Sequence, residues 1–214
     1  MRLTVFGATG RTGVQIVRQA AGAGHEVTAV VRDRSRLPLD PGTRVEVVEA
    51  DVMDPVAIEE AVKGRDAVIN AIGARDLRHP TSVCADSARS AIAAIRATGE
   101  DVRLVTASNS AMAPGEGDDP FTRYVVKPVI LSRLLQHMID DMRRAEGLVR
   151  ASGLPWTIVR AGRLTDRPGK GAYRKAVDRN VLGGFQITRA DFATAMLDAA
   201  TDRAAVGHVI SVGN

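Results

Sequence analysis

Residues 1–13, MRLTVFGATGRTG, carry the clearest structural pattern in this chain. An apolar run with the composition of a β-strand leads directly into three glycines, Gly7, Gly10 and Gly13, and a helical pattern begins near Thr12. Glycine allows a sharp turn after a strand, close approach of backbone amides to a pyrophosphate, and tight packing of the helix on the strand. A strand, a glycine turn and a helix in this order therefore predict a nucleotide-binding βαβ unit.

Short apolar runs and amphipathic segments continue to alternate along the rest of the chain. Strands are expected at Leu3–Phe6, Val27–Val31, Val45–Glu49, Ala67–Asn70, Arg103–Thr106, Thr157–Arg160 and Val209–Val212. Helices are expected at Thr12–Ala21, Pro55–Val62, Ser82–Ala97, about Ile130–Ser152 and Arg189–Ala200. Strands rich in Val and Ile with little polar alternation are typical of parallel sheets covered on both faces. We therefore predict an α/β protein with a Rossmann fold, in which a doubly wound, mostly parallel sheet of about seven strands has helices on both faces.

The length of 214 residues suits one domain, so residues 1–214 are predicted to form a single NAD(P)-binding unit. Two stretches, 111–130 and 161–187, interrupt the alternation and contain Pro, Gly and charged residues. Loops after the carboxyl ends of parallel strands form the ligand sites of such sheets. Both stretches are therefore predicted to be substrate loops.

The composition limits the classes of partner. Arginines scattered along the chain give a net charge of +4 without a block of like charges, which suits a phosphate-bearing ligand and gives little indication of nucleic-acid binding. A lone cysteine, Cys84, cannot form an internal disulfide, and no apolar run reaches the roughly 18 residues of a membrane helix. We expect a cytoplasmic protein that binds a small molecule, as a monomer or weak homodimer, with no nucleic-acid or membrane partner.

The end of the second predicted strand selects the nucleotide. NAD-specific folds hold an acidic residue there for the ribose 2′-hydroxyl, whereas this chain has Arg32, whose guanidinium suits a 2′-phosphate. NADP(H) is therefore preferred over NAD(H), although a strand end shifted by one residue would bring Asp33 to the ribose instead. The side chains of Thr9, Arg11 and Thr12 are expected to add donors to the glycine turn.

The later strand ends are expected to continue the site, because the carboxyl ends of parallel strands meet at one edge of a sheet. Asp51 and Val52 follow the third strand and can meet the adenine. A turn of small residues that can pass along the cofactor follows the fourth strand and consists of Ala71, Ile72 and Gly73. Just beyond it, Arg75 could reach phosphate or substrate.

Five segments together resemble the atypical short-chain dehydrogenase/reductases, and among them the small NADPH-dependent flavin reductases, the biliverdin reductase B group. The segments are GATGRTG, VVRDRSRLP, AIGAR, GLPWTIVRAGRLTD and GKGAY, in the same element order over nearly the whole chain. The resemblance implies NADPH bound across the strand ends and reduction of flavins, quinones or tetrapyrroles. The chain departs from the group at Ala161-Gly162-Arg163, where the group has Pro-Pro-His, and near Asn109, where the group has a serine.

The resemblance also implies contacts, carried over position by position. The phosphates would meet Thr9, Arg11, Thr12, Arg32, Ser35 and Arg36, and the adenine would meet Asp51 and Val52. The nicotinamide would lie against Thr106, Ala107, Ser108 and Asn109, with its carboxamide held by the backbone of Ala161 and Gly162. For Arg163, a substrate contact and a surface position are both open.

The polar cluster that ends the fifth strand is the predicted hydride-transfer site. Ser108 and Asn109 are predicted catalytic residues, acting as hydrogen-bond donors that orient substrate or carboxamide, and Ser110 is a predicted substrate contact. The broader short-chain family adds a Tyr-x-x-x-Lys pair, but Tyr124 and Lys127 are three positions apart and a proline follows at once. Because proline disfavours helix at the preceding residue, we expect loop or lid residues and no catalytic pair.

The remaining acidic and metal-binding candidates are weak. In the long predicted helix, Asp141 and Glu146 stand in place of the missing pair, and carboxylates of such a charged helix are expected at the surface. The four histidines show no ligand spacing, so no metal site is expected.

The favoured function is therefore an NADPH-dependent oxidoreductase that delivers hydride to a small planar acceptor such as a flavin or quinone, with solvent supplying the proton. One alternative is a regulatory protein that senses NADP(H) without turnover. A sugar-nucleotide epimerase or dehydratase is disfavoured by the absent Tyr-x-x-x-Lys pair and by a short C-terminal half. The fold alone does not separate these functions.

Overall fold

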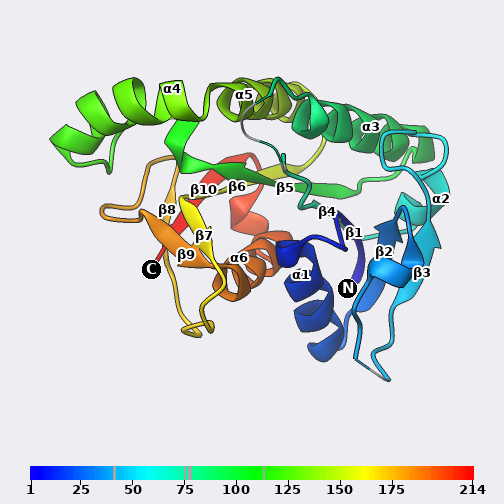
Figure 1. Cartoon of the computed structure of the whole chain (residues 1–214). Coiled ribbons are helices and arrows are strands. Elements are labelled where there is room, and N and C mark those ends of the chain that lie inside the picture. Colours follow the sequence, from blue (N-terminus) through cyan, green and yellow to red (C-terminus); the bar gives the residue numbers. More distant parts are fainter. Residues whose placement is uncertain (41, 75, 77–78, 113) are drawn as a thin grey trace.

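The seven predicted strands form the parallel part of the central sheet in a computed structural model, which describes residues 1–40, 42–74, 76, 79–112 and 114–214 (Figure 1). The strands run in the order β3-β2-β1-β4-β5-β6-β10, the doubly wound arrangement predicted from the sequence. Their bounds are β1 Arg2–Phe6, β2 Glu26–Val31, β3 Glu46–Glu49, β4 Ala67–Asn70, β5 Arg103–Asn109, β6 Trp156–Ala161 and β10 His208–Gly213. An eighth strand, β8 (Arg174–Val177), pairs antiparallel with β10 and forms the edge.

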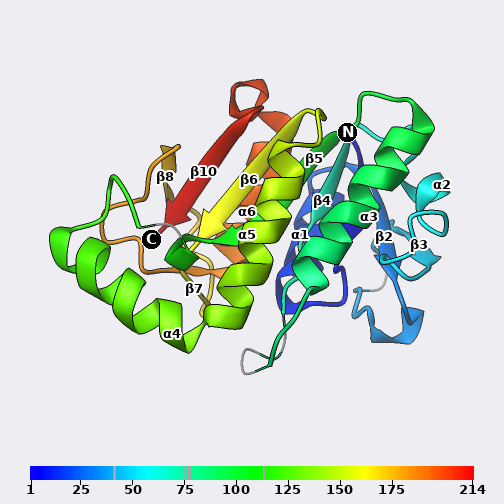
Figure 2. The same cartoon turned by 90° about the horizontal axis from the view of Figure 1, so that it is seen from above.

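Helices cover both faces of the sheet, because its central strands are apolar on both sides. α1 (Arg11–Gly22) and α6 (Arg189–Thr201) pack on one face, and α3 (Val83–Thr98) and α5 (Gln136–Arg150) on the other. Figure 2 shows α3 and α5 side by side across their face. A single-turn helix, α2 (Glu59–Val62), packs beside α3, so the helix expected from Pro55 is much shorter than predicted.

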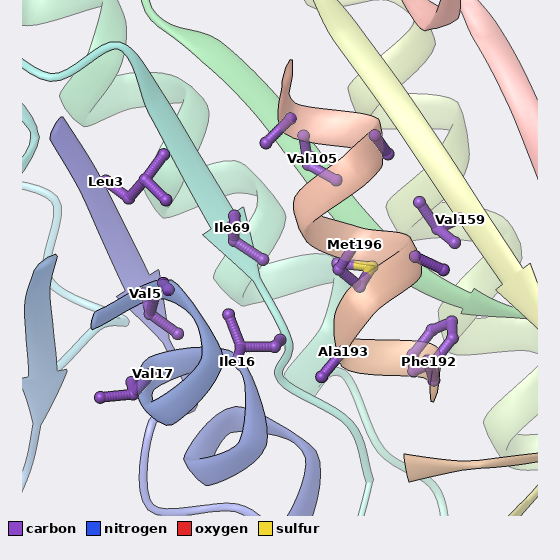
Figure 3. Close-up of a cluster of buried hydrophobic side chains, with 14 of the residues drawn as sticks. Leu3, Val5, Ile16, Val17, Ile69, Val105, Val159, Phe192, Ala193 and Met196 are labelled. Atoms are coloured by element: carbon purple, nitrogen blue, oxygen red, sulfur yellow. The ribbon is translucent and has the colours of Figure 1, made fainter. Parts of the chain in front are cut away.

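The core between the sheet and the pair α1–α6 is built mainly from aliphatic side chains, with Phe192 and Met196 contributed by α6. Leu3, Val5 and Ile69 project from the strands toward α1 and α6 (Figure 3). Ile16 of α1 and Met196 of α6 project toward the sheet from the two helices, and all five side chains are fully buried. Strand β1 thus lies inside the sheet between β2 and β4, and its side chains enter the cores on both faces just before the glycine turn.

Both of the predicted substrate loops contain strands or helices that were not predicted from the sequence. Within 161–187, the short strands β7 (Arg163–Thr165) and β9 (Gln186–Thr188) pair parallel to each other in a separate small sheet, and β8 joins the main sheet. Within 111–130, a π-helix, η3 (Thr122–Leu131), begins at Thr122 and continues into α4 (Ser132–Leu134). Pro128 lies inside η3, and because proline has no N–H, the regular α-helical ladder cannot run through it.

The long helix predicted from Ile130 is consequently wrong in its start and its continuity. The helical path begins eight residues earlier and is interrupted at Leu135, whose φ of −117° and ψ of 21° separate α4 from α5. The described residues also form three 3-10 turns: η1 (Arg34–Arg36), η2 (Ser110–Met112) and η4 (Arg203–Ala205). No helix in the described ranges has the length and apolar character needed to cross a membrane.

Candidate functional site

The glycine turn has the geometry of a cradle that only glycine can form. Gly7 has a φ of +76°, a left-handed conformation, and a Cβ built there would lie 3.0 Å from the carbonyl carbon of Ala71. A Cβ at Gly13 would lie 2.1 Å from the carbonyl oxygen of Gly7. Gly10 closes the turn by donating its N–H to Gly7 O at 2.9 Å. The first turn of α1 is thereby pressed against the end of β1.

The N-terminus of α1 is open to an anionic ligand. Gly10 is its N-cap, and no side chain in the described part of the protein caps the helix. The N–H groups of the first helical turn lack intrahelical partners and carry the positive end of the helix dipole. Together with the glycine cradle, this end of α1 fits the pyrophosphate of a dinucleotide.

Beside this helix end lies an open cavity of about 620 Å³ that joins the glycine turn to the second irregular loop. Thr9, Arg11 and Arg36 line it on one side, and the segment 165–169 with Arg189 lines it on the other. The carboxylate of Asp166 accepts from Arg11 Nη1 and Arg189 Nη1, each at 2.6 Å. The predicted phosphate residue Arg11 is therefore held at the cavity by an ion pair that the sequence did not indicate.

At the end of β2, the two candidates for ribose recognition, Arg32 and Asp33, have different surroundings. The Asp33 carboxylate accepts from Ser35 N at 3.0 Å and from Ser35 Oγ at 2.6 Å, which caps the turn η1 and lowers the pKa of Asp33. Asp33 is thereby engaged within its own turn, and so is the hydroxyl of Ser35, a predicted phosphate contact. Arg32 directly follows the strand and is exposed, with no side-chain partner among the described residues.

The predicted adenine and turn residues lie at the neighbouring strand ends. Asp51 accepts from Met53 N at 3.0 Å, and Val52 is buried in the core on the α3–α5 side. The turn of Ala71, Ile72 and Gly73 is anchored where Asn70 Oδ1 accepts from Ile72 N at 3.2 Å. Arg75, the predicted phosphate or substrate contact, lies outside the described residues.

The polar cluster at the end of β5 divides between the two faces of the sheet. Ser108 projects toward α5, where its Oγ donates to Glu146 Oε1 at 2.7 Å. Asn109 Oδ1 accepts from Ala111 N at 2.8 Å, which fixes the orientation of its side chain. The Oγ1 of Thr106 is buried with no hydrogen-bond partner in the described ranges, and Ser110 is half-buried at the start of η2.

Glu146 lies in a buried ionic cluster, so its predicted surface position is wrong. Its side chain is 1% exposed. Besides Ser108, the carboxylate accepts from Arg160 Nε at 2.8 Å and Arg160 Nη2 at 2.6 Å, and pairs with Arg150 Nη2 at 2.8 Å. Burial acts to raise the pKa of Glu146, but the hydrogen bonds and charges of Arg160, then Ser108 and Arg150, outweigh it and keep the pKa below its ordinary value. Glu146 is therefore ionised at neutral pH.

Asp141 is also buried, contrary to the same expectation. Its carboxylate accepts from the backbone N–H groups of Cys84 at 2.9 Å and Ala85 at 3.0 Å. These N–H groups belong to the first turn of α3, so a carboxylate on α5 caps the neighbouring helix. Asp141 thus has a structural role in joining α3 to α5.

Cys84, beside that cap, provides a first prediction. Burial, followed by the Asp141 carboxylate, raises the pKa of the Cys84 thiol to about 12 from its ordinary value of 9.0. A shift of this size lowers the thiolate fraction about 1,000-fold near pH 8, and the thiolate is the reactive form. We expect a disulfide reagent to label the native protein at least about 100-fold more slowly than the urea-unfolded chain, allowing for local opening. Comparable labelling rates for the two states would contradict this placement of Cys84.

Tyr124 and Lys127 do not form a catalytic pair, although the segment that carries them is helical and not a loop. Tyr124 is 66% exposed. Lys127 Nζ is buried and donates to both carboxylate oxygens of Asp118 at 2.8 Å. Burial lowers the pKa of Lys127, with the Asp118 pair opposing that shift. The two side chains therefore lie in different surroundings, one in solvent and one inside.

The end of β6 is closed by the second irregular loop. A Cβ at Gly162 would lie 2.4 Å from the carbonyl oxygen of Phe185, which also accepts from Arg163 N at 2.8 Å. Ala161 is buried, and the Arg163 side chain is exposed. The glycine at position 162 is thus needed for the close approach of Phe185. Contacts of Ala161 and Gly162 with a carboxamide stay a prediction.

No group of three or more His, Cys, Asp or Glu side chains that could hold a metal ion occurs among the residues that the structure describes. The arrangement instead fits a nicotinamide dinucleotide, which the glycine cradle, the open end of α1 and the arginines of the cavity could hold. Bound there, such a cofactor would supply hydride, and the residues around it would position it and exclude water.

Comparisons with known proteins agree with this geometry. Residues 7–203 match the family model described as NAD(P)H-binding. The chain is 29% identical over 203 residues to the uncharacterized protein YwnB of Bacillus subtilis, covering 92% of this chain and 91% of that protein. It is 26% identical to Oxidoreductase AgnL4 of Paecilomyces divaricatus, with 92% and 79% covered. A short-chain dehydrogenase/reductase of Veillonella parvula in complex with NADP has the same fold, with a TM-score of 0.77, 20% identity and 100% and 94% coverage.

Proposed function

Since the chain belongs to the NAD(P)H-binding family of Rossmann-fold oxidoreductases, we propose that it is an NADPH-dependent reductase that delivers hydride to a small planar acceptor such as a flavin or quinone. The observation that carries this proposal is the state of Ser108, whose hydroxyl donates to an ionised carboxylate. A ketone substrate needs an acid at its oxygen, and in the described residues neither Ser108 nor the pair Tyr124 and Lys127 is arranged to provide one.

Planar acceptors suit a site of this kind. Hydride transfer to a flavin or quinone gives an electron-rich product that can take its proton from solvent. The task left to the chain is to hold the two ring systems together and to exclude water from between them. The two substrate loops support this role, because Asp118 of the first loop accepts from Asn180 Nδ2 of the second at 2.9 Å.

The test is NADPH consumption by the purified protein with flavins, quinones and simple carbonyl compounds, with NADPH affinity measured in parallel. Oxidation by planar acceptors and not by simple ketones is the expected result. Tight NADPH binding without oxidation by any acceptor would instead favour an NADP(H)-sensing protein.

Replacement of Tyr124 by phenylalanine checks the absence of a tyrosine acid. Because the side chain is 66% exposed and η3 does not bring it to Lys127, we expect the variant to keep most of its turnover with the best acceptor. Ser108→Ala, assayed beside it, is expected to lower turnover. Collapse of the turnover number in Tyr124→Phe alone would restore the tyrosine as proton donor.

Arg32 is proposed to select NADP(H) over NAD(H) by pairing with the 2′-phosphate. A charge-assisted hydrogen bond is worth about 1.5–3 kcal/mol, so Arg32→Asp should weaken NADPH binding roughly 10- to 150-fold and change NADH binding by less than about threefold. Arg203→Asp, an equal change of charge at an exposed residue of η4, which precedes β10, controls for net charge. Equal losses for NADPH and NADH in Arg32→Asp would remove the argument for 2′-phosphate recognition.

A further inference from the structure

The Glu146 cluster, which consists of Glu146, Arg160, Arg150 and Ser108, is an unusual feature at the carboxyl ends of β5 and β6. The carboxylate is almost fully buried, and the Arg160 side chain is 14% exposed. Taking charges out of water is costly, and apolar residues of similar size often stabilise a fold at least as well as a buried ion pair. Stability alone therefore does not explain why charged residues occupy these buried positions.

Its effect on Ser108 is specific. A hydroxyl carries one proton, and the Oγ of Ser108 has a carboxylate oxygen at 2.7 Å and the sulfur of Met112 at 3.4 Å. The charged oxygen is much the stronger acceptor, so the proton points to Glu146. The lone pairs of Ser108 Oγ remain available to a ligand, and they can only accept a hydrogen bond from it. This arrangement favours an acceptor role for Ser108 over the donor role predicted from the sequence.

Arg160 keeps this arrangement in one state. It lies on β6 directly beside Ser108 in the register of the sheet and holds Glu146 with two parallel N–H donors. Arg150 approaches the same carboxylate from one turn further along α5. Because two guanidinium groups contact it, the carboxylate stays ionised. It therefore carries no proton that it could donate to Ser108.

We infer that Glu146 is a positioning residue that fixes Ser108 as a hydrogen-bond acceptor, so that the site selects planar acceptors with a ring N–H over their N-methyl counterparts. The inference deepens the proposed function and rests on it for the position of the acceptor at the end of β5. A ligand N–H satisfies the lone pairs of Ser108, whereas a methyl group leaves them unpaired and adds a steric clash.

The experiment compares the binding of lumiflavin and 3-methyllumiflavin to the protein saturated with NADP⁺, followed by flavin fluorescence. Oxidised cofactor is used so that no turnover is required. We expect the wild-type protein to bind lumiflavin about five- to tenfold more tightly, the value of one net hydrogen bond. Ser108→Ala should reduce this preference to within about twofold.

Glu146→Gln tests the positioning role itself, because the amide has the same shape and can donate to Ser108 Oγ. We expect the lumiflavin preference to fall to within about twofold in this variant, while Asp140→Asn, a neutralised carboxylate on the exposed face of α5, keeps it. A purely structural Glu146 would lower the unfolding temperature and leave the preference unchanged. If Glu146→Gln does not fold, Ser108→Ala alone decides.

The inference is overturned if the wild-type protein shows no preference, or if the preference survives in Ser108→Ala or in folded Glu146→Gln. Failure of the proposed function has a separate signature, because it appears as absent NADPH oxidation and does not enter a binding measurement with NADP⁺.

Discussion

Gly13→Ala is expected to abolish measurable NADPH binding and to destabilise the fold. The added Cβ would lie 2.1 Å from Gly7 O, 2.8 Å from Gly7 C and 2.9 Å from Ala8 Cα, and all three atoms belong to the backbone of the glycine turn. No side chain can rotate to relieve these contacts, so α1 must move away from β1 by roughly 1 Å or more to reach ordinary van der Waals distances. That movement opens the cradle that is proposed to hold the pyrophosphate.

Overpacking of this kind costs about 1–3 kcal/mol, and more where backbone must shift. Urea unfolding measures the loss of stability, and quenching or enhancement of NADPH fluorescence measures binding. We expect affinity to fall at least about 100-fold, because displacement of positioning groups by 1 Å has effects of that order.

Gly22→Ala is the matched control for this substitution. It lies in the same helix, and a Cβ built there meets no atom within 4 Å. Alanine favours helix over glycine by about 0.5–1 kcal/mol, so this variant should be slightly more stable and bind NADPH like the wild-type protein. Normal NADPH affinity in Gly13→Ala would show that the turn does not hold the cofactor.

Much of the fold could be predicted from the sequence because its main elements are determined by patterns within short stretches of the chain. A strand that is apolar on both faces, a turn that only glycine permits and an amphipathic helix leave clear signals within a few residues, and all seven parallel strands were found in this way. The strands β7 and β9 have three residues each, too few to show a period. The π-helix η3 was missed because Pro128 in its interior indicated a loop.

The geometry of the glycine turn could be predicted for the same reason, whereas the Glu146 cluster could not. Ser108, Glu146 and Arg160 come from three different elements, and the pairing of Ser108 with Glu146 spans 38 positions of sequence. The charged neighbours of Glu146 suggested a surface position. Its spacing was the signal that could have corrected this, because Glu146 lies four positions after Met142 and three before Val149, on the apolar stripe of α5.

A double-mutant cycle on Glu146 and Arg160 should show large, non-additive losses of stability. Glu146→Leu leaves Arg160 buried without its carboxylate, and Arg160→Met leaves the carboxylate with the half-exposed Arg150 as its only cation among its described partners, beside the Ser108 hydroxyl. Breaking a buried pair on one side costs about 3–5 kcal/mol. The double variant replaces both charges by apolar groups of similar volume, so it should be more stable than either single variant, with a coupling free energy of roughly 2–3 kcal/mol.

The pH dependence of stability separates an ion pair from mere packing at this position. The folded-state pKa of Glu146 lies below its ordinary value of 4.5, so the pair contributes its full stability above that value and loses it as the pH falls through the lowered pKa. The free energy of unfolding, measured in urea between neutral and acidic pH, should therefore decline more steeply in the wild-type protein than in the double variant. Parallel slopes, or a double variant less stable than both single ones, would mean that Glu146 and Arg160 stabilise the fold by shape and not by charge, and the fixed polarity of Ser108 would lose its physical basis.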